Sequence, residues 1–250
     1  MDIIWVSANE FGFEMLREVM KIRHGISVKA ILTLSEDATT VMYDSVAREK
    51  WYDFGVPVYE VRSINDSMDL LRKLLPATLV VCGWRQLVKK DILDLFSREV
   101  IGFHPALLPV GRGSAPIINA ILHGFKKSGI SMFYMKEGID DGDIIGQEWF
   151  NILDADDSID VYDKVIVSGR VLVRKYFPLL ADGLVKAVPQ DGSKVLVFDK
   201  PKLSDNRIYL DKESLEQVYR KIKALSRYLG AYIEKDGKKL IIRKAELVDV

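Results

Sequence analysis

The sequence contains a single cysteine, no excess of either charge and no long hydrophobic run. One cysteine, Cys82, excludes an internal disulfide framework and a cysteine-based metal cluster, and it fits a reducing compartment. No stretch approaches the roughly 20 apolar residues that span a bilayer, and no basic region followed by a long apolar one opens the chain. We therefore expect a cytoplasmic protein that neither crosses a membrane nor carries an export signal.

The balance of charge also restricts the partners. Lys and Arg together number 36, as do Asp and Glu, so the chain lacks the basic excess that a polyanion such as tRNA or DNA attracts. This argues against a nucleic-acid partner. The G-x-G-x-x-G pattern of dinucleotide-binding turns is missing from the N-terminal segment, so NAD binding has little support.

What the sequence does contain is the pattern of a large α/β domain. Short apolar runs alternate with amphipathic stretches through the first half, which predicts βαβ units around a parallel sheet. We expect a doubly wound, mostly parallel sheet. The expected strands are 3–7, 27–32, 58–61, 78–82 and 100–103, and the expected helices are 13–20, 68–75 and 91–96.

The pattern changes after Pro105. A loop rich in Pro and Gly, PALLPVGRGSAP at 105–116, precedes a helix at 117–123. Two strands at 129–135 and 144–152 then predict an antiparallel extension of the sheet. A helix over 158–176, stopped by Pro178, closes this domain.

A polar stretch punctuated by Pro and Gly separates the main domain from a small C-terminal unit. We place the main domain at 1–185, a linker at 186–204 and an α+β appendage at 205–250. The appendage is expected to hold a helix at 213–229 and a hairpin of strands 231–233 and 239–243 across the turn Asp236-Gly237. It is too small to be stable alone, so it must pack on the main domain or on a partner.

Two segments carry the chemistry. His104 follows a predicted strand, and ligands of doubly wound sheets bind outside the carboxyl ends of the strands. A lone histidine is often a structural group, yet histidine is also the side chain that exchanges a proton near neutral pH. The second segment, EGIDDGD at 137–143, would by itself be a solvated tight turn.

Together, GFHPALLPVGRGSAP and EGIDDGDII resemble the folate-dependent formyltransferases. That family includes glycinamide ribonucleotide transformylase, methionyl-tRNA formyltransferase and the sugar N-formyltransferases, and the last group is the closest in type. The resemblance covers essentially the whole chain. It implies a Rossmann-like formyltransferase core that uses 10-formyltetrahydrofolate as the donor co-substrate and needs no metal.

The resemblance further implies a catalytic trio of Asn, His and Asp. His104 and Asp140 match, whereas Gly102 stands where the family has Asn, which leaves open how the formyl oxygen is held and whether activity is reduced. Formyl transfer needs a base for the amine proton and a donor for the oxyanion. Neutral His104 could supply the first and protonated His104 the second, with Asp140 orienting the ring, and the sequence does not choose between them.

By the same resemblance, a set of residues lines the pterin pocket and another lies beside the acceptor. The donor set is Gln86, Leu87, Val88, Met135, Gly138, Ile139 and Asp141, and Arg112 and Gly113 lie beside the acceptor. We add to the acceptor side Gly102, where the family asparagine is missing, and Asn9, whose segment could begin a helix aimed at the acceptor. Plainer interpretations exist. Residues 83–86 could be an ordinary strand-to-helix connection, and Arg112 could be a solvated loop charge.

Three functions compete. We expect formyl transfer to the amine of a nucleotide-linked amino sugar, as in bacterial surface-polysaccharide synthesis, because the C-terminal region looks like the start of one shared by tRNA and sugar enzymes and then stops early. The alternatives are a methionyl-tRNA formyltransferase and a folate-binding protein whose catalytic machinery decayed at Gly102. The resemblance also allows a homodimer that uses the C-terminal region.

Overall fold

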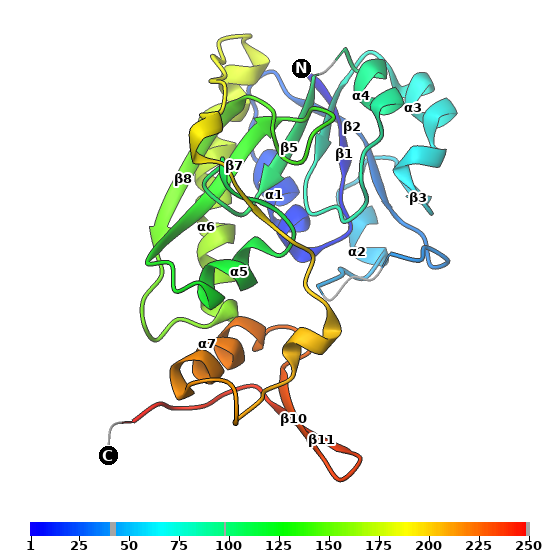
Figure 1. Cartoon of the computed structure of the whole chain (residues 1–250). Coiled ribbons are helices and arrows are strands. Elements are labelled where there is room, and N and C mark those ends of the chain that lie inside the picture. The colour runs from blue at the N-terminus through cyan, green and yellow to red at the C-terminus, as the bar shows by residue number, and fades with distance from the viewer. Residues whose placement is uncertain (41–43, 98, 249–250) are drawn as a thin grey trace.

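The computed structural model describes residues 1–40, 44–97 and 99–248, and its centre is a seven-stranded sheet (Figure 1). The strand order is β3-β2-β1-β4-β5-β7-β8, with β1 to β5 parallel and β7 and β8 antiparallel. This confirms the predicted doubly wound, mostly parallel sheet with an antiparallel extension. The strands are β1 Asp2–Val6, β2 Ser27–Leu34, β3 Val58–Val61, β4 Thr78–Val81, β5 Val100–His104, β7 Lys127–Tyr134 and β8 Ile144–Asn151.

Helices cover both faces of the sheet. One apolar cluster joins α1, α2, α5 and α6 to the sheet around Trp5 and Phe177, and a second joins α3 and α4 around Leu71 and Ile92. The helices are α1 Glu10–Val19, α2 Glu49–Tyr52, α3 Met68–Leu74, α4 Lys90–Leu95, α5 Pro116–Leu122, α6 Ser158–Ala181 and α7 Leu215–Leu225. No helix in the described part of the chain is long and apolar enough to cross a membrane.

The central strands follow from their sequences. Residues 3–6 of β1, Ile-Ile-Trp-Val, are fully buried, because a parallel strand with helices on both faces is covered on both sides. Each such side chain contributes about 1.5–3 kcal/mol of burial free energy. The sheet on which the site lies is therefore fixed by burial between two layers of helices.

The prediction that Pro178 ends the long helix is wrong, since α6 continues to Ala181. Pro178 lies in the last turn, so its missing N–H removes only one helical bond, and its carbonyl still accepts from the amide of Asp182 at 3.1 Å. Phe177, fully buried in the core, holds this turn against the sheet. At the other end, Asp157 and Asp160 form a capping box that fixes the start of α6.

The segments expected to be a plain loop and a plain linker contain regular structure. Strand β6, Val110–Gly113, lies in the loop and pairs in parallel with β9, Leu196–Phe198, in the linker. Val188 also exchanges two hydrogen bonds of 2.8 Å with Ile144 at the start of β8. The stretch 186–204 thus lies against the main domain, while the proposed boundaries at its two ends stay a prediction.

The C-terminal unit lies below α5 in Figure 1 and packs on the main domain, as its small size requires. Its helix α7 is shorter than the expected 213–229: Ser214 fixes its start by accepting from the amide of Gln217, and it ends at Leu225. The hairpin consists of β10 Ala231–Lys235 and β11 Lys238–Ile242. An ion pair of 2.5 Å between Arg227 and Glu10 joins the unit to α1.

Candidate functional site

His104 is the last residue of β5, at the carboxyl edge of the parallel strands. From β1 the chain proceeds outward to β2 and β3, and β4 and β5 lie on the other side of β1, so this edge holds the switch point of the sheet. The His104 residue is only 7% exposed. A titratable ring therefore stands where this class of sheet binds ligands, largely screened from water.

The geometry around the ring fixes its neutral tautomer. Nε2 of His104 lies 2.7 Å from the carbonyl oxygen of Gly111, and a carbonyl only accepts, so Nε2 carries the hydrogen. Nδ1 is then the unprotonated nitrogen, and it lies 3.5 Å from Oδ2 of Asp140. In the neutral ring, Nδ1 is therefore the nitrogen with a free lone pair, and it faces the Asp140 carboxylate.

Asp140 is held by its own backbone and by β6. It adopts a left-handed φ of +47°, which Asp tolerates better than most residues, and its Oδ2 accepts from the amide of Gly113 at 2.9 Å. Gly113 itself has a φ of +90°, and a Cβ there would lie 2.4 Å from the carbonyl oxygen of Phe198. Only glycine lets β6 approach β9 this closely while donating to Asp140.

The antiparallel strands hold the loop that follows His104. Ser131 of β7 donates to the carbonyl of Ala106 at 2.6 Å and accepts from the amide of Leu108 at 3.0 Å. Gln147 of β8 donates to the carbonyl of Leu108 at 2.9 Å. These bonds pair backbone groups that the irregular loop would leave without partners. They hold in place the loop that brings the Gly111 carbonyl to His104.

Gln190, in the linker, is a site residue that the sequence interpretation missed. Its Nε2 donates to the carbonyl oxygens of Asp140 at 2.7 Å and Gly142 at 2.8 Å. Its Oε1 accepts from Nε of Arg112 at 3.0 Å and from Nη2 at 2.8 Å. Two predicted site residues, Arg112 and Asp140, are thus brought together through a third.

Gly102 lies on β5 two residues before His104, so both belong to the same face of the strand. A Cβ at Gly102 would lie 2.9 Å from Cγ of Met135 and 3.0 Å from two ring atoms of Phe133. Its backbone is outside the left-handed region, so packing rather than φ excludes a side chain. The place of the family asparagine is occupied by a methionine and a phenylalanine.

Among the predicted donor residues, the side chain of Gln86 is engaged within the fold. It donates to the hydroxyl of Thr40 at 2.9 Å and to the carbonyl of Arg62 at 2.7 Å, and it accepts from the amide of Ile64 at 3.2 Å. A role of Gln86 in holding a pterin would therefore fall to its backbone.

The next two donor residues differ in burial. Leu87 is 76% exposed, whereas Val88 is 5% exposed and packs in the apolar cluster to which Met135 also contributes. Val88 and Met135 are far apart in the sequence, and the fold brings them to the same side of the sheet. An exposed leucine beside this cluster is an apolar surface that a flat ring could cover.

The acidic loop contains a buried acceptor. Oδ1 of Asp141 is buried and has no hydrogen-bond partner within the described residues, and such an atom costs free energy until a donor reaches it. Gly138 is required beside it, because a Cβ there would lie 2.1 Å from the other carboxylate oxygen. Ile139 is 60% exposed.

Asn9, predicted on the acceptor side, caps α1. Its Oδ1 accepts from the amide of Gly12 at 3.0 Å, and its Nδ2 donates to Asp44 at 3.0 Å. The hydroxyl of Tyr162 donates to the same carboxylate, and burial together with the Asp44 charge raises the pKa of Tyr162. Both ends of the Asn9 amide serve the fold, and an acceptor role for it stays a prediction.

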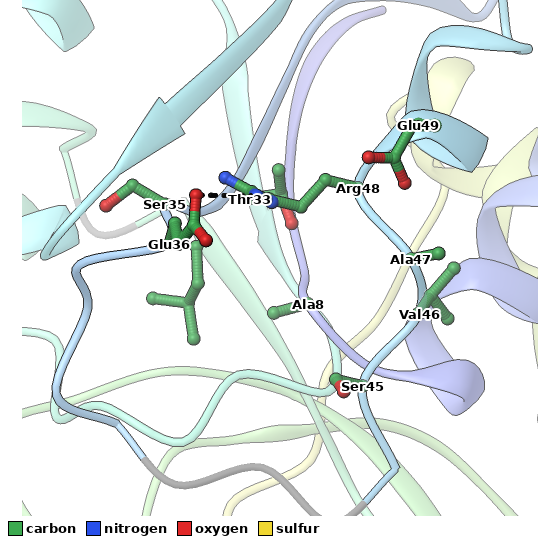
Figure 2. A pocket seen from close by; sticks show the side chains of 10 residues that line it. Ala8, Thr33, Ser35, Glu36, Ser45, Val46, Ala47, Arg48 and Glu49 are labelled. Carbon is green, nitrogen blue, oxygen red and sulfur yellow. Dashed lines mark hydrogen bonds and ion pairs between the residues drawn. The ribbon is translucent and has the colours of Figure 1, made fainter.

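A separate pocket of about 340 Å³ opens at the ends of β1 and β2 (Figure 2). The Arg48 guanidinium within it is paired with Glu36 at 3.1 Å and with Glu60 at 3.0 Å, so its charge is already offset. None of the predicted site residues lines this pocket. Its lining is Ala8, Thr33, Leu34, Ser35, Glu36, Ser45, Val46, Ala47, Arg48 and Glu49.

Within residues 1–40, 44–97 and 99–248, no three or more His, Cys, Asp or Glu side chains lie together in a group that could hold a metal ion.

Comparison with known proteins places this geometry in context. The family model described as "Formyl transferase" matches residues 19–175. Over 249 residues the chain is 33% identical to the methionyl-tRNA formyltransferase of Staphylococcus aureus (strain Newman), which covers 99% of this chain and 80% of that protein. It is 30% identical to the methionyl-tRNA formyltransferase of Lactobacillus gasseri, with 98% and 78% covered.

Solved structures share the fold. A 4-N formyltransferase from Francisella tularensis matches with a TM-score of 0.78 and 20% identity, over 100% of this chain and 98% of that one. An N-formyltransferase from Helicobacter canadensis, in complex with folinic acid and dTDP-3-aminofucose, matches with a TM-score of 0.73 and 18% identity, over 96% and 86%. At these identities the likeness concerns the fold alone.

The first prediction concerns the ring and its carboxylate. His104→Ala should lower turnover by roughly 10²- to 10⁴-fold, the usual contribution of a positioned acid or base, and Asp140→Asn should also cause a large loss because it removes the charge beside Nδ1. Steady-state kinetics checks both, with circular dichroism to confirm folding. Near-normal turnover in a folded variant would remove that residue from the mechanism.

The second prediction concerns Gly102. Restoring asparagine should raise turnover only if the pocket has space, and Met135 and Phe133 deny that space. We expect Gly102→Asn alone to be no faster than wild type, whereas Gly102→Asn with Met135→Ala and Phe133→Leu should exceed the Met135→Ala, Phe133→Leu control by on the order of 10²-fold, the value of one oxyanion donor. If the triple variant is no faster than this control, the site was rebuilt around glycine.

Proposed function

The chain belongs to the formyl transferase family, and on this premise we propose that it carries the formyl group of 10-formyltetrahydrofolate to the amine of a nucleotide-linked amino sugar. It is a formyl-transfer enzyme. The observation that carries the proposed mechanism is the orientation of His104, with Nε2–H bound to the Gly111 carbonyl and Nδ1 facing Asp140.

In the proposed reaction, His104 accepts the proton of the amine and later donates it. An attacking amine forms a bond to the formyl carbon and loses a proton, and Nδ1 of His104 is placed to take it. Asp140 stabilises the imidazolium without being protonated itself, because its carboxylate stands beside Nδ1 and is fixed by the Gly113 amide. When the bond to the leaving nitrogen breaks, the same proton can pass to that nitrogen.

The donor supplies the formyl carbon, and we propose a set of residues that would hold its ring. The unpartnered buried oxygen of Asp141 can accept a hydrogen bond from an N–H of the pterin. The apolar cluster of Val88 and Met135 can cover its face, and the exposed Leu87 can close over it. Peptide groups at Gln86, Gly138 and Ile139 complete the proposed donor side.

The formyl oxygen must be held without the family asparagine. Met135 and Phe133, which occupy that space, offer no strong donor. After Nδ1 of His104 has taken the proton it becomes a donor itself, and we propose that this N–H together with backbone amides stabilises the oxyanion. Nδ1 would then act first as the base that takes the amine proton and afterwards as the donor that binds the oxyanion, the two roles that the sequence left open.

We propose that the acceptor substrate is a small anionic molecule. Two N–H groups of Arg112 bind Gln190, and a guanidinium has five, so further donors are left for a phosphate. The equal totals of acidic and basic residues leave the chain without the net positive charge that would favour tRNA. A nucleotide-linked sugar provides phosphates near the amine without requiring such a surface.

A second candidate acceptor is methionyl-tRNA. It is favoured by the 33% identity over 249 residues to a methionyl-tRNA formyltransferase. A decayed folate-binding protein is the third candidate, supported by the glycine at position 102 and by the filled space beside it. A homodimer formed through the C-terminal region, and a cytoplasmic location, stay predictions from the sequence.

The third prediction tests donor and acceptor together. Binding of 5-formyltetrahydrofolate should raise the melting temperature without added metal, since a ligand selective for the folded state stabilises it by mass action. With 10-formyltetrahydrofolate present, mass spectrometry should then detect a formylated product from GDP-, UDP- or dTDP-linked amino sugars and none from methionyl-tRNA at low salt.

The opposite preference would transfer the assignment to the tRNA enzyme. Folate binding with no product from any of these acceptors would favour the decayed protein. No folate binding at millimolar concentration, together with binding of a nicotinamide cofactor, would remove the donor from the proposal.

A further inference from the structure

Gln190 reaches the site from a segment whose path is fixed on both sides. Before it, Val188 is paired with Ile144 at the start of β8, directly after the acidic loop. Pro189 follows with its restricted φ. After it, β9 pairs with β6, the strand that contains Arg112. The Gln190 side chain is therefore directed into the space between two elements of the site by backbone pairing at each end.

Its amide is used completely. A carboxamide has two N–H donors and an oxygen with two lone pairs. The two donors go to the carbonyls of Asp140 and Gly142, and the oxygen accepts from two nitrogens of Arg112. Carbonyls only accept and guanidinium only donates, so the orientation of the amide follows from its partners.

These bonds act on the same residue that faces His104. The Asp140 carboxylate lies beside Nδ1, and the Asp140 carbonyl is bound by Gln190, so the backbone at this left-handed position is fixed on its peptide side. The guanidinium on the other side of Gln190 belongs to the proposed acceptor contact. One side chain thus connects the place of the acceptor to the orientation of the catalytic carboxylate.

We propose that Gln190 is a positioning residue that aligns Asp140 with His104 and holds Arg112 for the acceptor. This inference rests on the proposed function for its kinetic consequence, but its geometric consequence does not require turnover. Gln190 does not touch the reacting atoms. It acts through the peptide group of Asp140 and the guanidinium of Arg112.

Two substitutions remove the bonds that Gln190 donates and differ in their effect on Arg112. Gln190→Met keeps the length of the side chain and loses both sets of bonds, so kcat should fall by on the order of 10²-fold, as misplacement of a reacting group does, and KM for the acceptor should rise. Gln190→Glu still accepts from Arg112 but cannot donate to the two carbonyls. It should lower kcat similarly, and because its carboxylate offsets the charge of Arg112 it should raise KM for an anionic acceptor as well.

A double-mutant cycle distinguishes positioning from a general loss of structure. In an Asp140→Asn background, Gln190→Met should cost less than about threefold in kcat, because the carboxylate that it aligns is already gone. Gln217→Ala is the matched control, since it removes a glutamine whose side chain also bonds to the backbone, at the cap of α7. It should leave kcat unchanged. A full additive loss in the Asp140→Asn background would overturn the proposal.

A readout without turnover separates this proposal from the proposed function. The amide of Gly113 donates to Asp140, so its hydrogen exchange should become at least about tenfold faster in Gln190→Met than in wild type or Gln217→Ala, measured by NMR. Unchanged exchange at Gly113 in folded Gln190→Met and Gln190→Glu would overturn the role of Gln190, whatever the turnover. Absence of wild-type turnover with faster exchange would reject only the proposed reaction.

Discussion

The hydrogen bond from Nε2 of His104 to the Gly111 carbonyl is the contact on which the site depends. It requires the chain to turn back on itself within seven residues, and a Cβ at Gly111 would lie 2.9 Å from that of Ala106. The bond fixes which ring nitrogen is free. Without it, Nδ1 would not be held toward Asp140, and neither proton transfer nor stabilisation of the cation would have a defined geometry.

Three elements outside the parallel sheet maintain this contact. The antiparallel strands β7 and β8 hold the loop through Ser131 and Gln147, and β9 holds β6 beside the acidic loop. The parallel half of the sheet therefore supplies the histidine, while the antiparallel half and the linker supply its surroundings. A packed core of this kind transmits small displacements, so residues remote from the reacting atoms can affect the reaction.

The sequence predicted what depends on local pattern. The apolar runs of β1 and β4 gave their strands, and the turn at Asp236-Gly237 gave the hairpin, because burial and turn chemistry are written in neighbouring residues. It could not predict the β6–β9 pair, Gln190, or the filling of the Gly102 position by Met135. Each of these joins residues distant in the chain, and a polar linker offers no periodic signal. The prediction that Pro178 ends α6 was wrong because the free-energy cost of a proline depends on its position in the helix.

The central claim is that the reaction takes place at Nδ1 of His104, and a crystal structure of the protein with 5-formyltetrahydrofolate tests it most directly. The account predicts that the formyl group lies on the Asp140 side of the ring and that the Nε2 to Gly111 bond is intact. An amine within hydrogen-bond reach of Nδ1 should then lie within roughly 3–3.5 Å of the formyl carbon. A folate bound elsewhere, or a His104 ring turned so that Nε2 faces the formyl group, would contradict it.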